Sequence, residues 1–148
     1  MTFSGKSIKQ STPRDLHIFL SDFYEEIAYD GSPEFKDFIP KGVWFTLYED
    51  EAVAGFINLE PLNNVTWNCH VMLYATFRGN HSEQWGIQVA QVARERLGVK
   101  KFLAFTPYVT AKKYAERMGF KNIGILTASI QKNGILMDQY MLELGEAK

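Results

Sequence analysis

The turn that begins at Arg78-Gly79 is the stretch of the sequence best suited to bind an anion. It follows a segment with the period of a strand and precedes a segment with the period of a helix. The first N–H groups of a helix have no partner inside the helix, so a strand, a turn and a helix in this order commonly hold phosphate. Arg78 adds a positive charge at the same place. The sequence therefore predicts a phosphate-bearing ligand here.

His70 is a candidate proton acceptor a few residues before this turn. It lies on the more polar side of the strand-like segment, and an imidazole titrates in the range that a general base needs. A hydrogen-bonded structural histidine is the other interpretation, and the pattern alone leaves both open. No metal site is predicted, because His17, His70 and His81 with the single Cys69 lack the spacing of metal ligands. Cys69 falls on the apolar side of the segment, which favours a buried, inert thiol.

The elements around these residues follow from hydrophobic periodicity. Apolar and more polar residues alternate over Thr66–Phe77, which predicts one strand. A helix follows, with Trp85 on its apolar side and Gly98 at its end. The pattern then predicts a second strand over Lys101–Thr106 and a short helix with apolar residues over Ala111–Met118.

The rest of the chain completes an α+β order. Thr12-Pro13-Arg14-Asp15 is a helix-start signal, and Asn133-Gly134 is a strong signal for a type I′ hairpin turn. The order is strand, helix, short helix, three strands, helix, strand, helix and two strands. This implies a single domain over residues 1–148, with a mixed sheet and helices on its faces. The other predicted segments are strands over Ser7–Gln10, Val43–Tyr48, Ala52–Leu59, Ile123–Ile130 and Ile135–Leu144, a helix over Pro13–Ile27 and a short helical turn that starts at Ser32–Glu34 and ends before Pro40.

Size and charge narrow the classes of function. The chain has 148 residues, of which 46% are hydrophobic and 14% aromatic, so it can build a core and is not expected to be disordered. A formal net charge of −1 without a sustained Lys/Arg patch argues against a nucleic-acid partner. No segment approaches the ~20 apolar residues of a membrane span. No secretory signal is expected, because Met1–Lys9 carries no apolar stretch. A single cysteine cannot form an internal disulfide, so the cytoplasm is the expected location.

Two motifs give the chain a resemblance to a known family. Phe77-Arg78-Gly79 enters a helix, and the segment Tyr114–Phe120 closes one with a Gly-Phe pair. Together with the order of elements, these motifs resemble the GNAT family of acetyl-CoA-dependent N-acetyltransferases, including its small phage and prophage members. The resemblance implies the acyl-CoA N-acyltransferase fold. It also implies acetyl-CoA as the acyl donor and a primary amine, on a small molecule or a protein, as the acceptor.

The resemblance assigns cofactor roles to the positions that match the family's motifs. Backbone N–H groups in the turn after Phe77 would hold the cofactor pyrophosphate, with the Arg78 side chain assisting. The end of the preceding strand would pair with pantetheine and polarise the thioester carbonyl. Lys113 is a candidate for the 3′-phosphate. The cofactor-binding positions are Leu73, Tyr74, Ala75, Arg78, Gly79, Asn80, His81, Ser82, Glu83 and Lys113.

For proton transfer, the resemblance favours His70, which lies near the place where the family often keeps its base. Glu60, at the end of the neighbouring strand, is the reserve base. The family's usual position for the tyrosine that protonates the leaving thiolate carries Ala115, so Tyr114 or Tyr108 is the candidate acid. Packing is the simpler interpretation for Tyr114, and helix capping or cleft lining is the simpler one for Tyr108.

Two functions therefore stand side by side. The first is transfer of an acetyl group from acetyl-CoA to a primary amine by direct attack on the thioester. The alternative is an inactive domain of the same fold that binds a protein partner, because His81 and Glu83 stand where the family's signature has glycines. The sequence does not identify the acceptor. A homodimer through the C-terminal hairpin is a further expectation, based on the apolar residues Ile130, Ile135, Leu136 and Met137 around its turn.

Overall fold

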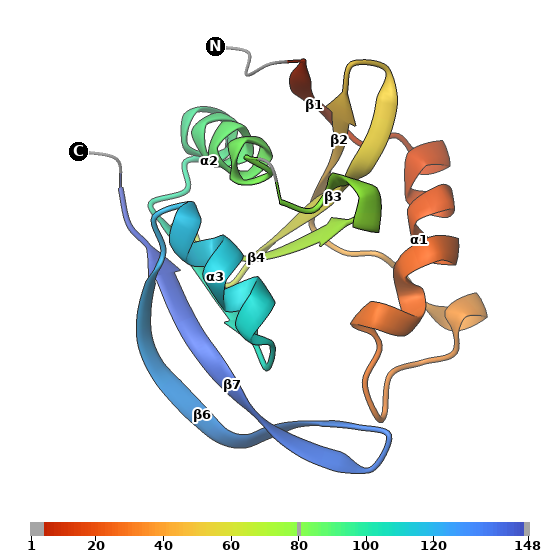
Figure 1. Ribbon diagram of the computed structural model, residues 1–148, viewed down its shortest axis with the longest axis vertical. Helices are drawn as coiled ribbons and strands as arrows, with labels where there is room; N and C mark the ends of the chain where they lie inside the picture. Colours follow the sequence, from red (N-terminus) through yellow and green to blue (C-terminus); the bar gives the residue numbers. More distant parts are fainter. Residues whose placement is uncertain (1–4, 80, 147–148) are drawn as a thin grey trace.

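A seven-stranded sheet with helices packed on both faces carries all the other elements (Figure 1). The computed structural model describes residues 5–79 and 81–146. The helices are α1 (Pro13–Ile27), α2 (Glu83–Leu97) and α3 (Val109–Arg117), with 3-10 turns η1 (Phe35–Asp37) and η2 (Ala75–Phe77). The strands are β1 (Lys6–Gln10), β2 (Val43–Glu49), β3 (Ala52–Pro61), β4 (Thr66–Leu73), β5 (Lys101–Thr106), β6 (Lys121–Lys132) and β7 (Ile135–Leu144).

The sheet is mixed, and its strand order is β1-β2-β3-β4-β5-β7-β6. Neighbouring strands are antiparallel except for β4 and β5, which are parallel. The C-terminal hairpin joins the sheet through its second strand, β7, which lies next to β5. This arrangement confirms the predicted α+β order. Within the described ranges, none of the helices is long and apolar enough to cross a membrane.

Local signals in the sequence set where the elements begin and end. The N–H of Asp15 donates to Thr12 Oγ1 (3.2 Å), and the N–H of Thr12 donates to Asp15 Oδ2 (3.3 Å). A helix cap of this kind is worth about 1 kcal/mol. Gly98 has a φ of 70° at the end of α2, a conformation that favours glycine. Positive φ angles at Asn133 and Gly134 make the tight β6–β7 turn. These predicted boundaries are confirmed.

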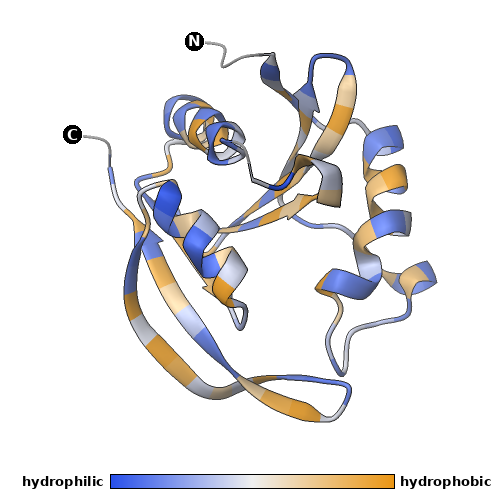
Figure 2. Cartoon of the chain, viewed as in Figure 1, coloured by the Kyte–Doolittle hydropathy of each residue, from blue (hydrophilic) through white to orange (hydrophobic). Residues whose placement is uncertain are grey.

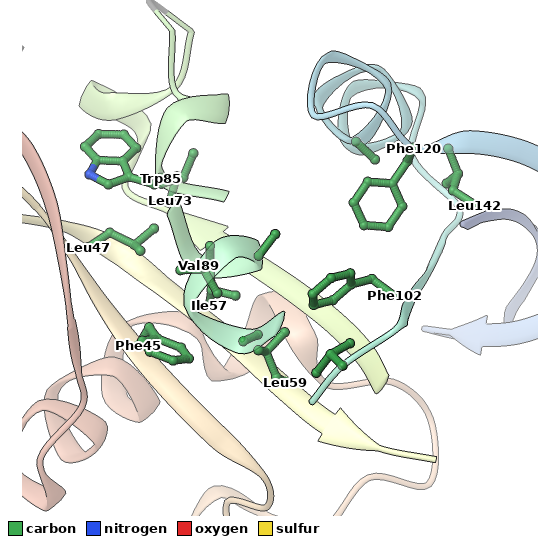
Figure 3. Close-up of a cluster of buried hydrophobic side chains, with 14 of the residues drawn as sticks. Phe45, Leu47, Ile57, Leu59, Leu73, Trp85, Val89, Phe102, Phe120 and Leu142 are labelled. Atoms are coloured by element: carbon green, nitrogen blue, oxygen red, sulfur yellow. The ribbon is translucent and has the colours of Figure 1, made fainter. Parts of the chain in front are cut away.

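The face of the sheet under α2 and α3 is closed by a continuous apolar core (Figure 3). Trp85 of α2 is fully buried, and its Nε1 donates to the backbone carbonyl of Tyr48 at 2.8 Å. The helix is therefore fixed on the sheet two residues after its first residue. Further members of this core are Phe45, Leu47, Ile57, Leu59, Leu73, Val89, Phe102, Phe120 and Leu142.

The opposite face is covered by α1 only in part. The ring of Phe19 lies 4.6 Å from the ring of Trp44 and 4.9 Å from the ring of Phe56, measured between centroids. Met72 of β4 belongs to the same cluster. Because alternate residues of a strand share a face, Phe56 and Met72 show which positions of β3 and β4 lie on the α1 side. The next such positions along these strands lie outside the cluster.

β4 is shorter than the sequence predicts. The predicted strand over Thr66–Phe77 is wrong beyond Leu73, where pairing with β3 ends opposite Gly55. The chain then forms the turn η2, in which the N–H of Phe77 donates to the carbonyl of Tyr74 at 2.9 Å. The alternation of residue types continues through this segment. The last hydrogen bond to β3 is donated by the N–H of Tyr74, and from Ala75 on the chain pairs with neither β3 nor β5. A turn satisfies its backbone instead.

The β6–β7 hairpin arches away from α3, and its tip returns to the end of α1 (Figure 1). The Asp30 carboxylate accepts the N–H groups of Asn133 and Gly134, both at 2.9 Å. Lys132 Nζ donates to two backbone carbonyls in the last turn of α1, at 2.8 and 3.0 Å. The hydrogen bonds to Asp30, from Gly134 above all, lower the pKa of its carboxyl group. These hydrogen bonds join the tip of the hairpin to the end of α1. The hairpin and α1 border the part of the sheet that α1 leaves uncovered.

Hydrophobic segments alternate with polar ones along both strands of the hairpin (Figure 2). Near its tip, Ile135 is 64% exposed and Leu136 is 60% exposed. β6 is also an edge strand of the sheet. A homodimer that covers this surface stays a prediction.

Candidate active site

β4 and β5 run side by side over three residue pairs and then part. Their last pair is Asn68 with Leu103. Beyond this pair, β4 continues on β3 and β5 continues on β7. The two parallel strands therefore do not pair with each other beyond this point, and we call this gap in the backbone pairing the opening. The candidate site is centred on this opening.

The backbone of β4 presents hydrogen-bonding groups to the opening. The N–H and C=O groups of successive residues in a strand point to alternate sides. The N–H of Tyr74 donates to a β3 carbonyl at 2.9 Å, so the backbone groups of Val71 and Leu73 point toward β5. Leu73, a predicted cofactor-binding residue, thus lies at the opening. The N–H of Tyr74 is used within the sheet, and Ala75 lies in the turn η2.

The turn between η2 and α2 adopts a left-handed backbone at two positions. Gly79 has a φ of 84° and His81 has a φ of 63°, so His81 takes the conformation that a signature glycine would supply. Its side chain is 83% exposed. Among the described residues, the N–H groups of Gly79, His81 and Glu83 find no acceptor. Asn80, also predicted to bind the cofactor, lies outside the described residues.

The Glu83 carboxylate does not cap these N–H groups. Its Oε2 lies 3.5 Å from Arg117 Nε of α3, and its Oε1 lies 3.9 Å from His81 Nδ1. Arg117 therefore holds a carboxylate that would otherwise compete with a phosphate at the start of α2. Ser82, the residue before it, is fully buried, and its carbonyl accepts the Tyr114 hydroxyl at 2.9 Å.

The Arg78 side chain points toward α1. Its Nη2 lies 3.0 Å from Glu26 Oε1, and its Nε donates to the Leu73 carbonyl at 3.1 Å. The guanidinium therefore bridges the opening and the last turn of α1, and a role at the pyrophosphate would require it to leave Glu26. Sequence reasoning missed Glu26, which lies 52 positions from Arg78 and belongs to no local motif.

His70 lies on the α1 side of the sheet, beside the opening. It is opposite Asn58 of β3, and its side chain is exposed. The surrounding protein nevertheless lowers the pKa of His70 by desolvation, and the nearby negative charge of Glu26 partly offsets this effect. A histidine with a lowered pKa is neutral at pH 7 and can accept a proton. The predicted placement on the polar strand face is thus matched by the structure.

Tyr74 is the second residue that joins the opening to α1. Its ring lies 4.7 Å from the ring of Phe23, and its hydroxyl donates to the Asp22 carboxylate. Burial and this carboxylate raise the pKa of Tyr74. The C-terminal half of α1 therefore turns two carboxylates, Asp22 and Glu26, toward β4 and the following turn. Asp22 was also missed by sequence reasoning, because its partner is remote in sequence.

The remaining predicted residues are spread over several elements. The hydroxyl of Tyr114 is already donated to α2, and burial raises its pKa, so a structural role is the one its contacts show. Tyr108 precedes the first turn of α3 and is 49% exposed. Glu60 of β3 lies on the same face of the sheet as His70. It is two residues beyond Asn58, the residue that pairs with His70. Lys113 is exposed on α3. Catalytic or cofactor roles for these residues stay predictions.

Solved structures that share this fold include N-acetyltransferases. A spermidine N-acetyltransferase from Vibrio cholerae, solved in complex with CoA and spermine, is 13% identical with a TM-score of 0.77, covering 97% of this chain and 96% of its own. A mutant of the Vibrio cholerae enzyme reaches a TM-score of 0.81 at 12% identity, covering 97% and 95%. A ribosomal-protein-S5-alanine acetyltransferase from Vibrio fischeri is 11% identical with a TM-score of 0.76, covering 98% and 95%. The fold is therefore the GNAT acyltransferase fold, as the sequence motifs predicted.

The sequence also matches a family model described as "Protein of unknown function (DUF2824)" over residues 14–144, and the chain belongs to this family. No curated protein matches it. Because one fold can host many functions, the activity has to be argued from the site.

Proposed function

We propose that the protein is an acetyl-CoA-dependent N-acetyltransferase that transfers an acetyl group to a primary amine. One arrangement carries the proposal. The opening between β4 and β5 is followed, a few residues along the chain, by the left-handed turn at Gly79 and His81 and the start of α2. Such an arrangement offers one place for an extended thioester arm and another for the phosphates attached to it.

The residues at the turn fit a diphosphate. The N–H groups of Gly79, His81 and Glu83 donate to no acceptor within the described part of the chain, and the positive end of the α2 dipole favours an anion there. Arg117 keeps the Glu83 carboxylate engaged. The backbone of Leu73 would pair with the arm of the donor. When bound, acetyl-CoA would supply an activated acyl carbonyl at the opening.

His70 is the residue best placed to take the proton of the acceptor amine. An alkyl ammonium with a pKa near ~10.4 is charged at pH 7. It must lose a proton before the nitrogen can form a bond to the acetyl carbon as the C–S bond breaks. His70 has a lowered pKa and lies beside the opening, and Glu60 on the same face remains the reserve base.

A general acid for the departing sulfur is helpful but not essential. A thiol pKa of about 8.5, by analogy with cysteine, makes the thiolate a tolerable leaving group. Of the two candidate tyrosines, Tyr108 is preferred because the Tyr114 hydroxyl already donates to a backbone carbonyl.

An inactive domain that binds a protein partner is the second candidate, and one observation favours it. Arg78 Nε occupies the Leu73 carbonyl at the opening, and the guanidinium is tied to Glu26. If this contact persists in the presence of CoA, the β4 side of the opening is closed to the donor. Both ends of the Arg78–Glu26 pair are 56% exposed, and exposed pairs of this kind are worth about 0–1 kcal/mol. The contact is therefore weak enough for a ligand to displace.

Cofactor binding and thiol release separate the two candidates. Calorimetric titration with CoA should give a dissociation constant in the micromolar range, and acetyl-CoA with a panel of primary amines should release free thiol. The Arg78→Gln variant tests the second candidate, because removing a permanent block would strengthen CoA binding. Absence of binding at millimolar CoA, in both the wild type and Arg78→Gln, would remove the acetyltransferase proposal.

A further inference from the structure

The uncovered part of the α1-side face is polar on one side of the opening. Asn58 lies opposite His70, and Glu60 lies opposite Asn68, on β3 and β4. These positions continue the rows of Phe56 and Met72, so they share the α1 side of the sheet. The Glu26 carboxylate at the end of α1 borders the same area and is 56% exposed.

The other side of the opening carries apolar side chains on β5, β7 and β6, with Gln139 and Glu143 of β7 on the same face. Phe102 and Ala104 of β5 pack toward the core under α2 and α3, so Leu103 and Phe105 face the α1 side. Phe105 pairs with Met141 of β7, and Leu126 of β6 lies one strand further out, opposite Gln139. Phe105 is 37% exposed and Leu126 is 40% exposed, and neither belongs to the α1 cluster.

His70 and Phe105 hold equivalent places on the two strands. Each lies two residues beyond the last pair, Asn68 with Leu103, and both are on the α1-side face. They therefore lie at matching positions on the two sides of the opening, and one is an imidazole and the other an aromatic ring. The cation that contacts Glu26 in the present structure, the Arg78 guanidinium, shows that this carboxylate accepts a positive group at the border of the opening.

We infer that the acceptor is a primary amine carried on a hydrophobic body, rather than a polyamine. Its ammonium end would lie between Glu26 and His70, and its apolar body would lie over Phe105 and Met141. This inference rests on the proposed acetyltransferase function and names the substrate class of that site. The positive charge of the ammonium favours the side of the opening with the Glu26 carboxylate. Burial of apolar surface favours contact between the hydrophobic body and Phe105.

A second charge at the far end of the acceptor would be unfavourable. That end would lie over the side chains of Phe105, Met141 and Leu126, which are apolar and do not replace the water that the charge would lose. A terminal diamine and a simple alkylamine with the same carbon chain differ in this end alone. The ratio of their kcat/KM values therefore measures how strongly the apolar side of the site disfavours a second charge.

The test compares n-hexylamine with 1,6-diaminohexane as acceptors, at one pH and with saturating acetyl-CoA, by thiol release. The wild type should show a kcat/KM for n-hexylamine about tenfold higher or more. Phe105→Ser should reduce this preference several-fold while leaving CoA binding unchanged, and Phe105→Leu should retain it. Ile87→Ser is the matched control, because Ile87 is also 37% exposed but lies on α2, on the other side of the sheet.

Three outcomes are distinguishable. A preference for n-hexylamine that falls in Phe105→Ser and not in Ile87→Ser supports the inference. A preference for the diamine, or a ratio that Phe105→Ser does not change while it still binds CoA, overturns the inference and leaves the acetyltransferase function intact. Absence of thiol release with every amine tested overturns the proposed function and the inference together.

Discussion

The two faces of the sheet are built in different ways. Under α2 and α3, one continuous apolar layer runs from Phe45 on β2 to Leu142 on β7 (Figure 3). On the other face, the aromatic cluster under α1 ends at Phe56 and Met72. The next positions on that face are Asn58 and His70, and no helix of the described chain packs over them.

The two faces therefore have different roles. The face under α2 and α3 holds the elements in position, and the α1-side face carries the candidate reactive groups. The closed face anchors α2 through Trp85. It thereby holds in place the turn whose N–H groups at Gly79, His81 and Glu83 find no acceptor among the described residues. The open face carries the imidazole of His70 and the Glu26 carboxylate. Substitutions on the closed face should therefore act on stability, and those on the open face should act on turnover.

The largest effect on the closed face is expected from Trp85→Ala. Truncation of a fully buried tryptophan should cost about 3–5 kcal/mol of unfolding free energy, and the Tyr48 carbonyl would lose its donor as well. Urea unfolding measures the change. Ile87→Ala, on the exposed side of the same helix, is the control and should change the free energy by about 0.5 kcal/mol or less. Equal losses in the two variants would contradict the contrast between the faces.

On the open face, His70→Ala should lower turnover by roughly 10²–10⁴-fold if His70 is the general base. Its unfolding free energy should change little, because the side chain is exposed. Thiol release at saturating acetyl-CoA measures turnover, and calorimetry with CoA checks that the cofactor site is intact. An unchanged rate would transfer the role of base to Glu60, and Glu60→Gln would then be the variant to measure.

The lowered pKa of His70 also predicts how stability depends on pH. The reference pKa is 6.5 and the folded value lies below it, so the unfolded chain binds this proton more readily than the folded chain. The stabilising contribution is therefore fully present above pH 6.5 and is lost as the pH falls below 6.5 toward the folded pKa. Unfolding free energies between pH 5 and 8 should show a shallower slope in His70→Ala than in the wild type. Identical slopes would show that the environment of His70 is not desolvated.

A smaller and more specific effect is expected at Gly79. Gly79 and Gly98 flank α2, both have a positive φ, and an added Cβ would meet no atom within 4 Å at either. Gly79→Ala and Gly98→Ala should each cost about 1–2 kcal/mol of stability, because both force a side chain into a left-handed backbone. CoA binding should weaken about tenfold in Gly79→Ala alone, because only that turn is assigned to the pyrophosphate. A similar loss of binding in Gly98→Ala would contradict the assignment.

Much of the fold could be predicted from sequence because its signals are local. The Thr12–Asp15 capping box, Gly98 and the Asn133-Gly134 turn each act through neighbouring backbone groups, and the structure has all three where they were predicted. The end of β4 could not be predicted in this way. The alternation over Thr66–Phe77 describes the residues themselves, whereas a strand also needs a pairing partner, and pairing ends at Leu73.

The sequence predicted candidate site residues only where the residue type and its local pattern already indicate a chemical role. An imidazole on a polar strand face indicates His70, and a turn before a helix indicates Gly79 and its neighbours. Glu26 gives no such signal in the sequence. Its place at the site is recognised from its ion pair with Arg78, whose Nη2 lies 3.0 Å from Glu26 Oε1 in the folded chain. The apolar side chains around Phe105 likewise cannot be assigned to the site from sequence, because this requires knowing where β4 and β5 stop pairing.

The most direct test of the account follows the backbone amides of the turn by ¹H–¹⁵N NMR during titration with CoA. The account predicts that the amide signals of Gly79, His81 and Glu83 shift more than those elsewhere in α2, and that the shifts saturate at micromolar CoA. Signals in this turn that stay unchanged at millimolar CoA would contradict the central claim that these amides bind a diphosphate.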